Sequence, residues 1–296
     1  MENNKILLIG GNGYIGSRLY DYLSPNYDIT NVDACWFGKI YDETIEIDYK
    51  DLTKKFISQF SHIILLAGHS SVSMCDNLKQ PFDNNVVNFI DLIEKINDEQ
   101  ILIYSSTAAI YGNNSNLVDE TYPLDKSINF YDYTKMCNEN IMELYPNKKI
   151  IGLRFGSVGG FSKNFRKENL MNSISTSAHF DNRIKISNAE NYRSVLGIID
   201  LCKSIEKILI LGYKKRVYNL TSLNDKIINF GKKLQSLVGC ELIVDDSLNT
   251  NYSFNCSNKL FEHDYDYIFT DTIESIYSDI IDNFDKIVVN EKRKNI

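Results

Sequence analysis

Short runs of apolar residues alternate with longer amphipathic stretches through the first half of the chain. The runs are continuous rather than interrupted by polar residues, which is typical of parallel strands buried on both faces. Five runs have this character: 5–9, 27–33, 62–67, 101–105 and 149–154. The stretches between them repeat apolar residues at helical spacing in 15–23, 84–96 and 133–145. The pattern predicts an α/β fold in which helices cover both faces of a doubly wound parallel sheet.

The pattern changes after about residue 156. The second half is more polar and irregular, with a predicted helix at 200–211, a strand at 216–220 and a helix at 224–238. No repeat, low-complexity tract or long Pro/Gly/Ser linker separates the halves. We therefore expect two lobes, divided near residue 155, without a flexible hinge.

Composition narrows the function classes. The 296 residues carry 32 Lys and Arg against 39 Asp and Glu, a net charge of −7, which argues against a broad nucleic-acid-binding face. The six cysteines form no CxxC pair, as expected for reduced thiols in a cytoplasmic protein rather than a disulfide framework or a metal site. The first residues lack the apolar segment of a signal peptide, and no apolar run reaches the roughly 18 residues of a membrane span. We expect a soluble cytoplasmic protein without metal or membrane segment.

A glycine-rich turn, Gly10-Gly-Asn-Gly-Tyr-Ile-Gly16, directly follows the first predicted strand and opens a helix. Its spacing satisfies both GxxGxxG and GxGxxG. Such a turn needs glycine because it is tight and because its backbone must approach a pyrophosphate, which the free N–H groups of the helix N-terminus then bind. The candidate contact residues are Gly10, Gly13, Tyr14, Ile15 and Gly16.

Asp33 ends the second predicted strand, where an acidic residue supports dinucleotide binding. Its carboxylate would accept hydrogen bonds from the adenosine ribose hydroxyls and repel a 2′-phosphate. Ala34 and Cys35 follow it without an adjacent arginine, and Lys39 is the nearest cation. The sequence therefore predicts NAD rather than NADP as the cofactor. Trp36 is either a wall of the adenine pocket or ordinary packing.

Tyr131 and Lys135 stand four residues apart in a predicted helical stretch, so they share one helix face about 6 Å apart. The ammonium, together with a positive nicotinamide ring, would lower the pKa of the tyrosine toward neutrality. The hydroxyl cluster Ser105-Ser106-Thr107 ends a predicted strand, where an open α/β sheet places its ligands. These groups predict proton-transfer chemistry at that edge of the sheet.

In this order, the motifs resemble the extended short-chain dehydrogenase/reductase family, in particular its NAD-dependent sugar-nucleotide epimerases and dehydratases. The resemblance covers nearly the whole chain and rests on the glycine turn, Asp33, Leu66-Ala67-Gly68, Ser105-Ser106-Thr107, Ile110-Tyr111-Gly112, Tyr131 with Lys135, and Leu153-Arg154. It implies a Rossmann-like NAD-binding domain in residues 1–155. Residues 156–296 would then form a smaller sugar-nucleotide lobe, with some segments returning to the first domain.

The resemblance also implies roles for individual residues. Tyr131 would be the general base, Lys135 would bind the nicotinamide ribose, and Thr107 would hydrogen-bond the reacting oxygen. Further cofactor-binding positions are Asp48, Leu66, Ala67, Gly68 and Ser105. Asp48 occupies the position that usually contacts the adenine.

In the second half, the segment around Asn169 and Leu170 resembles the loop that holds the nucleotide of the substrate. Arg193 stands where an arginine of the family clasps the pyrophosphate of that substrate, and a guanidinium fork suits bidentate phosphate contact. Ser157 replaces an asparagine that is usual in the epimerases, so the substrate stays open among UDP-, GDP- and dTDP-sugars. A homodimer through the helices that carry Tyr131 is also implied.

Several reactions would start with oxidation of a sugar hydroxyl. Dehydration needs an extra acid/base pair, which the dehydratases place directly after the catalytic threonine, whereas this chain has Ala108-Ala109. Keto-sugar reductases commonly use NADPH, against which Asp33 argues. Epimerisation at C4 needs only the three catalytic groups and a retained NAD. We therefore expect a C4 epimerase; an NAD(P)-linked reductase or dehydrogenase, and a non-catalytic NAD-binding sensor or scaffold, stay open as alternatives.

Overall fold

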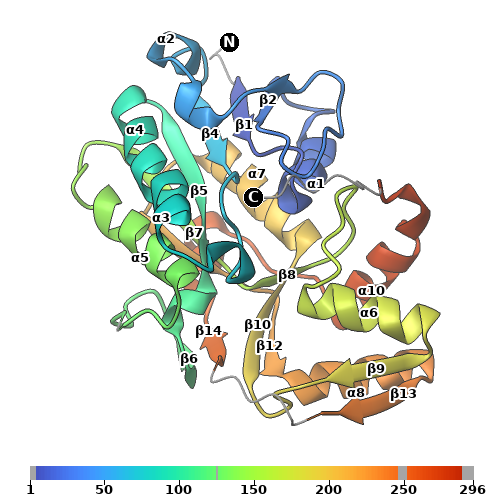
Figure 1. Ribbon diagram of the computed structural model, residues 1–296. Helices are drawn as coiled ribbons and strands as arrows, with labels where there is room; N and C mark the ends of the chain where they lie inside the picture. The colour runs from blue at the N-terminus through green and yellow to red at the C-terminus, as the bar shows by residue number, and fades with distance from the viewer. Residues whose placement is uncertain (1–4, 125, 246–251, 289–296) are drawn as a thin grey trace.

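The computed structural model describes residues 5–124, 126–245 and 252–288. Within these ranges, a seven-stranded parallel sheet in the order β11-β7-β5-β4-β1-β2-β3 lies between two layers of helices (Figure 1). Its strands are β1 (Ile6–Ile9), β2 (Ile29–Asp33), β3 (Ile45–Glu46), β4 (His62–Leu65), β5 (Ile101–Thr107), β7 (Lys149–Phe155) and β11 (Val217–Leu220). The predicted doubly wound parallel sheet is confirmed.

Each face of the sheet is covered by its own helices. One face packs against α1 (Tyr14–Leu23), α7 (Ile198–Leu211) and α9 (Lys259–Tyr265), and the other against α2 (Lys54–Ile57), α4 (Asn88–Lys95) and α5 (Phe130–Met142). In β1, Ile6 and Leu8 point into the first layer, whereas Leu7 and Ile9 point into the second. Because successive side chains alternate between two buried faces, the strands are apolar throughout.

The smaller lobe, at the lower right of Figure 1, has its own core, and we call it the substrate lobe after its predicted role. Its sheets join β8 (Ser157–Gly159), β10 (Tyr192–Gly197) and β12 (Leu223–Lys226), and separately β9 (Arg183–Ile186) and β13 (Glu241–Val244). Its helices are α6 (Leu170–Phe180), α8 (Ile227–Val238) and α10 (Ile273–Ile281). The sequence pattern predicts only one strand after residue 156, at 216–220, and misses the strands of this lobe. These strands are short, β9 alternates exposed and buried residues, and no residue of β13 is fully buried.

The two halves of the chain are interleaved. Strand β7 ends at Phe155, but β11, α7 and α9 return from the second half to the large sheet. In the opposite direction, β6 (Asn114–Val118) leaves the first half and pairs with β14 (Phe254–Cys256). A boundary near residue 155 in the sequence therefore does not coincide with a simple boundary between the two lobes in the structure.

Two of the helix starts that differ from those predicted have a clear local cause. The predicted helix 224–238 begins at Ile227, because residues 224–226 belong to β12. Helix α5 begins at Phe130, three residues earlier than predicted, because the side chain of Asn129 accepts a hydrogen bond from the N–H of Asp132 and caps the helix.

Among the described residues, no helix is long and apolar enough to cross a bilayer. All six cysteines lie in the described ranges and are free thiols, most of them buried.

Candidate active site at the carboxyl edge of the sheet

The glycine turn joins β1 to α1, and close packing requires glycine at two of its positions, Gly10 and Gly16. Gly10 has a φ of +96°, and a Cβ there would stand 2.5 Å from the backbone nitrogen of Ala67. A Cβ on Gly16 would stand 1.9 Å from the carbonyl oxygen of Gly10. At Gly13, the N-cap of α1, a Cβ would meet a single described atom within 4 Å, at 3.3 Å.

The N-terminus of α1 carries the predicted contact residues Tyr14 and Ile15 in its first turn. No described side chain caps this terminus, so its first N–H groups are left for an anion. The open approach at Gly13 leads to those N–H groups. The turn therefore fits the pyrophosphate of a dinucleotide.

Asp33 ends β2 beside this turn. Its carboxylate accepts hydrogen bonds from the backbone N–H groups of Asn12 (2.8 Å) and Cys35 (2.7 Å). Burial raises the pKa of Asp33, and the two backbone hydrogen bonds counteract that shift. Sequence reasoning missed Asn12, a buried side chain whose Oδ1 accepts a hydrogen bond from the N–H of Ile40 and so orders the loop after Asp33. The geometry fits a ribose at this carboxylate.

The segment after β4 borders the turn from the neighbouring strand. The N–H groups of Leu66 and Ala67 both donate to the carbonyl of Ile9, at 2.8 and 3.1 Å. Gly68 has a φ of +144°, and a Cβ there would stand 2.6 Å from Oδ1 of Asn85. These positions therefore lie against β1, at the point where the strand order reverses and open α/β sheets bind ligands.

Two further candidates have structural contacts. Asp48 caps a short helix by accepting a hydrogen bond from the N–H of Lys50 at 3.2 Å, two residues past β3. Trp36 packs edge-on against the ring of His69, with 5.0 Å between ring centres, so its contact is with the loop after β4. An adenine contact by Asp48 stays a prediction.

The fold brings Thr107, Tyr131 and Lys135 together, and we call them the catalytic trio after their predicted role. Thr107 is the last residue of β5, and its hydroxyl lies beside the phenol of Tyr131 on α5, where it acts to lower the pKa of that tyrosine. Nζ of Lys135 lies 5.9 Å from the centre of the Tyr131 ring and donates to the carbonyl of Ser105 at 2.8 Å. A threonine, a phenol and an ammonium at one strand end can hold an alcohol oxygen and move its proton.

Burial shifts the pKa values of two members of the catalytic trio. Burial and, to a smaller extent, the neighbouring Asp132 raise the pKa of Tyr131 to about 12, although Thr107 and Arg166 act to lower it. Burial also lowers the pKa of Lys135 to about 8. With the protein groups alone the pKa of Tyr131 thus lies above its usual value, and the shift toward neutrality, which is expected with a bound nicotinamide ring, stays a prediction. Sequence reasoning missed Arg166, which reaches across from the substrate lobe to donate to the hydroxyl of Ser70 at 3.1 Å.

A buried ion pair between α5 and β7 lies next to the catalytic trio. Glu139, one turn after Lys135, accepts hydrogen bonds from two nitrogens of Arg154, the shorter at 2.6 Å, and both side chains are about 5% exposed. Glu139 also accepts from the hydroxyl of Ser106 at 2.6 Å, and Arg154 donates to the hydroxyl of Tyr111 at 2.6 Å. These bonds fix the end of β5 against α5 and explain the Leu153-Arg154 motif.

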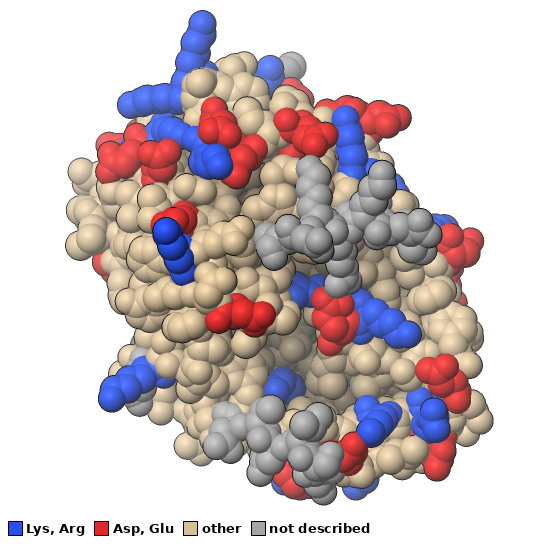
Figure 2. Space-filling model, viewed as in Figure 1, with Lys and Arg blue, Asp and Glu red and all other residues tan. Residues whose placement is uncertain are grey.

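The predicted substrate contacts lie on adjoining elements of the substrate lobe. Ser157 opens β8, which pairs with β10, the strand of Arg193. Asn169 precedes α6 and donates to the carbonyl of Val158 at 2.9 Å, while Leu170 is the first residue of that helix. Figure 2 shows a hollow between the two lobes with Lys and Arg side chains at its edges. The four candidates are thus assembled on one lobe, although no substrate contact is tested by this geometry.

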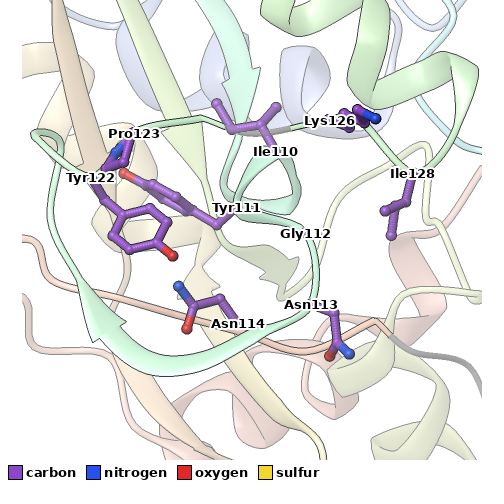
Figure 3. A pocket seen from close by; sticks show the side chains of 9 residues that line it. All are labelled: Ile110, Tyr111, Gly112, Asn113, Asn114, Tyr122, Pro123, Lys126 and Ile128. Atoms are coloured by element: carbon purple, nitrogen blue, oxygen red, sulfur yellow. The ribbon is translucent and has the colours of Figure 1, made fainter.

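A cavity of about 230 Å³ lies apart from the catalytic trio, beyond Tyr111 (Figure 3). Its lining residues are Ile110, Tyr111, Gly112, Asn113, Asn114, Tyr122, Pro123, Lys126 and Ile128. A second cavity of about 10 Å³, which touches Ser105 and Lys135, has room for about one water. Neither cavity accommodates a nucleotide, so the hollow between the lobes is the candidate site.

Comparison with known proteins agrees with this geometry. A family profile described as "NAD dependent epimerase/dehydratase family" matches residues 6–221. The UDP-glucose 4-epimerase of Lactobacillus helveticus is 32% identical over 177 residues, which are 53% of this chain and 53% of that relative. The chain thus aligns with about half the length of such curated epimerases.

Solved structures match over nearly the whole chain. The ADP-L-glycero-D-manno-heptose-6-epimerase of Helicobacter pylori has a TM-score of 0.83 at 20% identity, covering 97% of each chain. The UDP-glucuronic acid 4-epimerase of Bacillus cereus, in complex with UDP-glucuronic acid and NAD, has a TM-score of 0.81 at 19% identity and covers 95% of this chain and 99% of that one. At these identities the match concerns the fold.

Proposed function

The chain belongs to the NAD-dependent epimerase/dehydratase family, and from this premise we propose that it is a C4 epimerase of a sugar nucleotide. The observation that carries the proposal is the catalytic trio followed directly by Ala108 and Ala109, both buried. Removal of water across C5 and C6 needs a second acid/base pair, and two methyl groups cannot move protons. The groups present suffice for oxidation and reduction at a single carbon.

The residues divide the chemistry among them. Tyr131 takes the proton from the sugar hydroxyl and later returns it, while Thr107 hydrogen-bonds the same oxygen. Lys135, anchored on the carbonyl of Ser105, holds the nicotinamide ribose. The glycine turn and Asp33 hold the pyrophosphate and the adenosine ribose. Bound NAD would supply a hydride acceptor and a positive ring whose charge favours the phenolate.

The proposed substrate is a nucleoside diphosphate sugar. Arg193 would bind its diphosphate, with Ser157, Asn169 and Leu170 around the nucleotide and sugar. A guanidinium can satisfy two phosphate oxygens at once, which a neutral side chain cannot. By their names, two of the three proteins reported above act on UDP-sugars, so UDP-glucose and UDP-glucuronic acid are the first substrates to test, followed by GDP- and dTDP-sugars.

The proposed assembly is a homodimer through the helices next to the site. Phe130 and Tyr133 on α5, together with Val87 just before α4, are exposed apolar side chains on the outer surface of this layer. Sedimentation equilibrium tests the assembly, and a concentration-independent mass of one chain would contradict it. The free thiols favour the cytoplasm as the compartment.

Product analysis tests the proposed reaction. The protein is incubated with each sugar nucleotide and catalytic NAD, and proton NMR follows the sugar ring while absorbance at 340 nm follows NADH. An epimerase forms the C4 epimer without net NADH. Accumulation of NADH in step with product, or a strict need for added NADH, would favour the dehydrogenase or reductase alternative. Bound NAD without turnover of any sugar nucleotide would favour the sensor or scaffold.

A further inference from the structure

Arg193 is a partly buried cation that packs against two aromatic rings. Its guanidinium carbon lies 5.1 Å from the ring centre of Tyr252 and 5.0 Å from that of Phe254. Nη1 donates to the carbonyl oxygens of Tyr192 and Tyr252. Burial lowers the pKa of Arg193 to about 10, and none of its described contacts is a carboxylate. A desolvated guanidinium of this kind binds an anion strongly once one arrives.

Asp132 is a buried anion next to the proposed base. It follows Tyr131 directly in the first turn of α5 and is fully buried. Its carboxylate accepts hydrogen bonds from the hydroxyl of Tyr252, at 3.1 Å to Oδ1, and from the side-chain amide of Asn129, at 2.7 Å to Oδ2. The carboxylate is therefore engaged with a residue that is distant in sequence.

Tyr252 contacts both of these charged residues. Its ring and carbonyl hold Arg193, and its hydroxyl reaches Asp132 on the helix of Tyr131. We propose that Tyr252 is a positioning residue that fixes the anion-binding Arg193 relative to Tyr131, so that a substrate anchored by its diphosphate presents the sugar hydroxyl to the base. This inference rests on the proposed function, because it assigns Arg193 to the diphosphate.

The backbone next to Tyr252 is held in place independently of the Tyr252 side chain. The N–H of Asn114 donates to the carbonyl of Ser253 at 2.7 Å, and the N–H of Tyr192 donates to the hydroxyl of Ser253 at 2.9 Å. Strand β14 then continues beside β6. A changed side chain at position 252 therefore alters its own contacts while the segment keeps its place.

Two substitutions separate the contacts of Tyr252. Tyr252→Phe removes the hydroxyl and keeps the ring over Arg193, so we expect kcat for epimerisation to fall about tenfold while KM stays within about twofold. Tyr252→Leu removes the ring as well, so we expect KM to rise about tenfold in addition. A purely structural role would not produce this split between kcat and KM.

The partner and control variants sharpen the test. Asp132→Ala removes the other partner of the same hydrogen bond. We therefore expect the double variant with Tyr252→Phe to have the same kcat as the less active of the two single variants. Tyr133→Phe removes a hydroxyl from an exposed tyrosine on the same helix and is expected to keep full kcat. Native kcat in Tyr252→Phe, or a loss of kcat that merely follows a loss of folded protein in thermal unfolding, would overturn the proposal.

Calorimetric titration with UDP, GDP and dTDP gives a readout that is independent of turnover. We expect Tyr252→Leu to weaken binding of the preferred diphosphate about tenfold and Tyr252→Phe to leave it unchanged. If diphosphate binding by the native protein and the two variants follows this pattern but no sugar nucleotide is converted, the epimerase function fails while the role of Tyr252 in positioning Arg193 stands. If no diphosphate binds, or Tyr252→Leu binds it as the native protein does, the positioning role is overturned.

Discussion

At the scale of the residue, the proposed active site contains two groups whose charged forms the protein disfavours. Burial raises the pKa of Tyr131 to about 12 and lowers that of Lys135 to about 8. Near neutral pH the tyrosine therefore keeps its proton, and the ammonium is held at a cost. Such perturbed groups, side by side at the end of β5, are typical of a site of proton transfer.

Replacing Tyr131 by phenylalanine deletes the base without deleting its ring. We expect kcat to fall by about 10² to 10⁴, because proton transfer is lost, while NAD binding survives. Fluorescence titration with NADH and the NMR product assay measure the two quantities. Tyr133→Phe serves as the control, and full activity of Tyr131→Phe would refute the assignment.

Lys135→Met tests how far burial of the Lys135 ammonium lowers the free energy of unfolding. In the folded protein the pKa of Lys135 falls from 10.5 to about 8, so between these values the unfolded chain binds more protons and stability rises with pH. We expect the methionine variant to be inactive but more stable at pH 7 by about 1–3 kcal/mol. Urea unfolding at pH 7 and pH 10 measures this gap, which should narrow at the higher pH. A variant less stable than the native protein at pH 7 would contradict the argument.

Asp33 predicts which dinucleotide binds. A 2′-phosphate beside this half-buried carboxylate would meet like charge, so we expect NADH to bind at least about tenfold more tightly than NADPH. Parallel titrations of the apo-protein measure both affinities. Tighter binding of NADPH would show that Lys39, the nearest cation, outweighs Asp33.

At the scale of the element, the sequence predicts what its local pattern encodes. The strands of the large sheet are recognisable in the sequence because both of their faces are buried. The catalytic trio is recognisable because Tyr131 and Lys135 are four residues apart, which places them on one face of a helix. The strands of the substrate lobe escape prediction because they are short and partly polar. Tyr252 escapes it because its bond to Asp132 joins residues 120 positions apart, which no local pattern records.

The glycine turn allows two roles of glycine to be separated. Gly16→Ala places a methyl group 1.9 Å from a carbonyl oxygen, so we expect it to cost about 1–3 kcal/mol of stability. At Gly13 the φ of −73° suits alanine and the nearest atom is 3.3 Å away, so we expect a thermal unfolding midpoint close to that of the native protein. The added methyl group nevertheless stands where the pyrophosphate would approach.

We therefore expect Gly13→Ala to weaken NADH binding at least about tenfold without loss of stability. Differential scanning calorimetry and fluorescence titration measure the pair of variants. Native affinity in Gly13→Ala would mean that this turn does not hold the pyrophosphate.

At the scale of the whole molecule, the two lobes depend on each other. The large sheet receives β11 from residues 217–220, and one of its faces is covered by α7 and α9. Conversely, β14, which contacts β10 of the substrate lobe, pairs with β6 from the first half of the sequence. Each lobe thus buries apolar surface that the other half of the sequence supplies.

This interleaving predicts that residues 1–155 do not fold alone. The fragment would leave the edge of β7 unpaired and the face that contacts α7 and α9 open to water. We expect the fragment to bind a hydrophobic dye, to give poorly dispersed NMR spectra and to lack a near-ultraviolet circular dichroism signal. The full chain is the control. A native-like spectrum for the fragment would show that the first domain is autonomous.

The ion pair of Glu139 and Arg154 has a consequence for how this sequence can change over generations. Loss of one partner leaves a buried, uncompensated charge, which costs about 3–5 kcal/mol in proteins whose whole stability is about 5–15 kcal/mol. Replacement of both partners by apolar residues of similar volume can be neutral. A change from the ion pair to an apolar pair, made one residue at a time, therefore passes through a variant that is barely stable. We expect these two positions, 15 residues apart in the chain, to be either both retained or both replaced among related sequences.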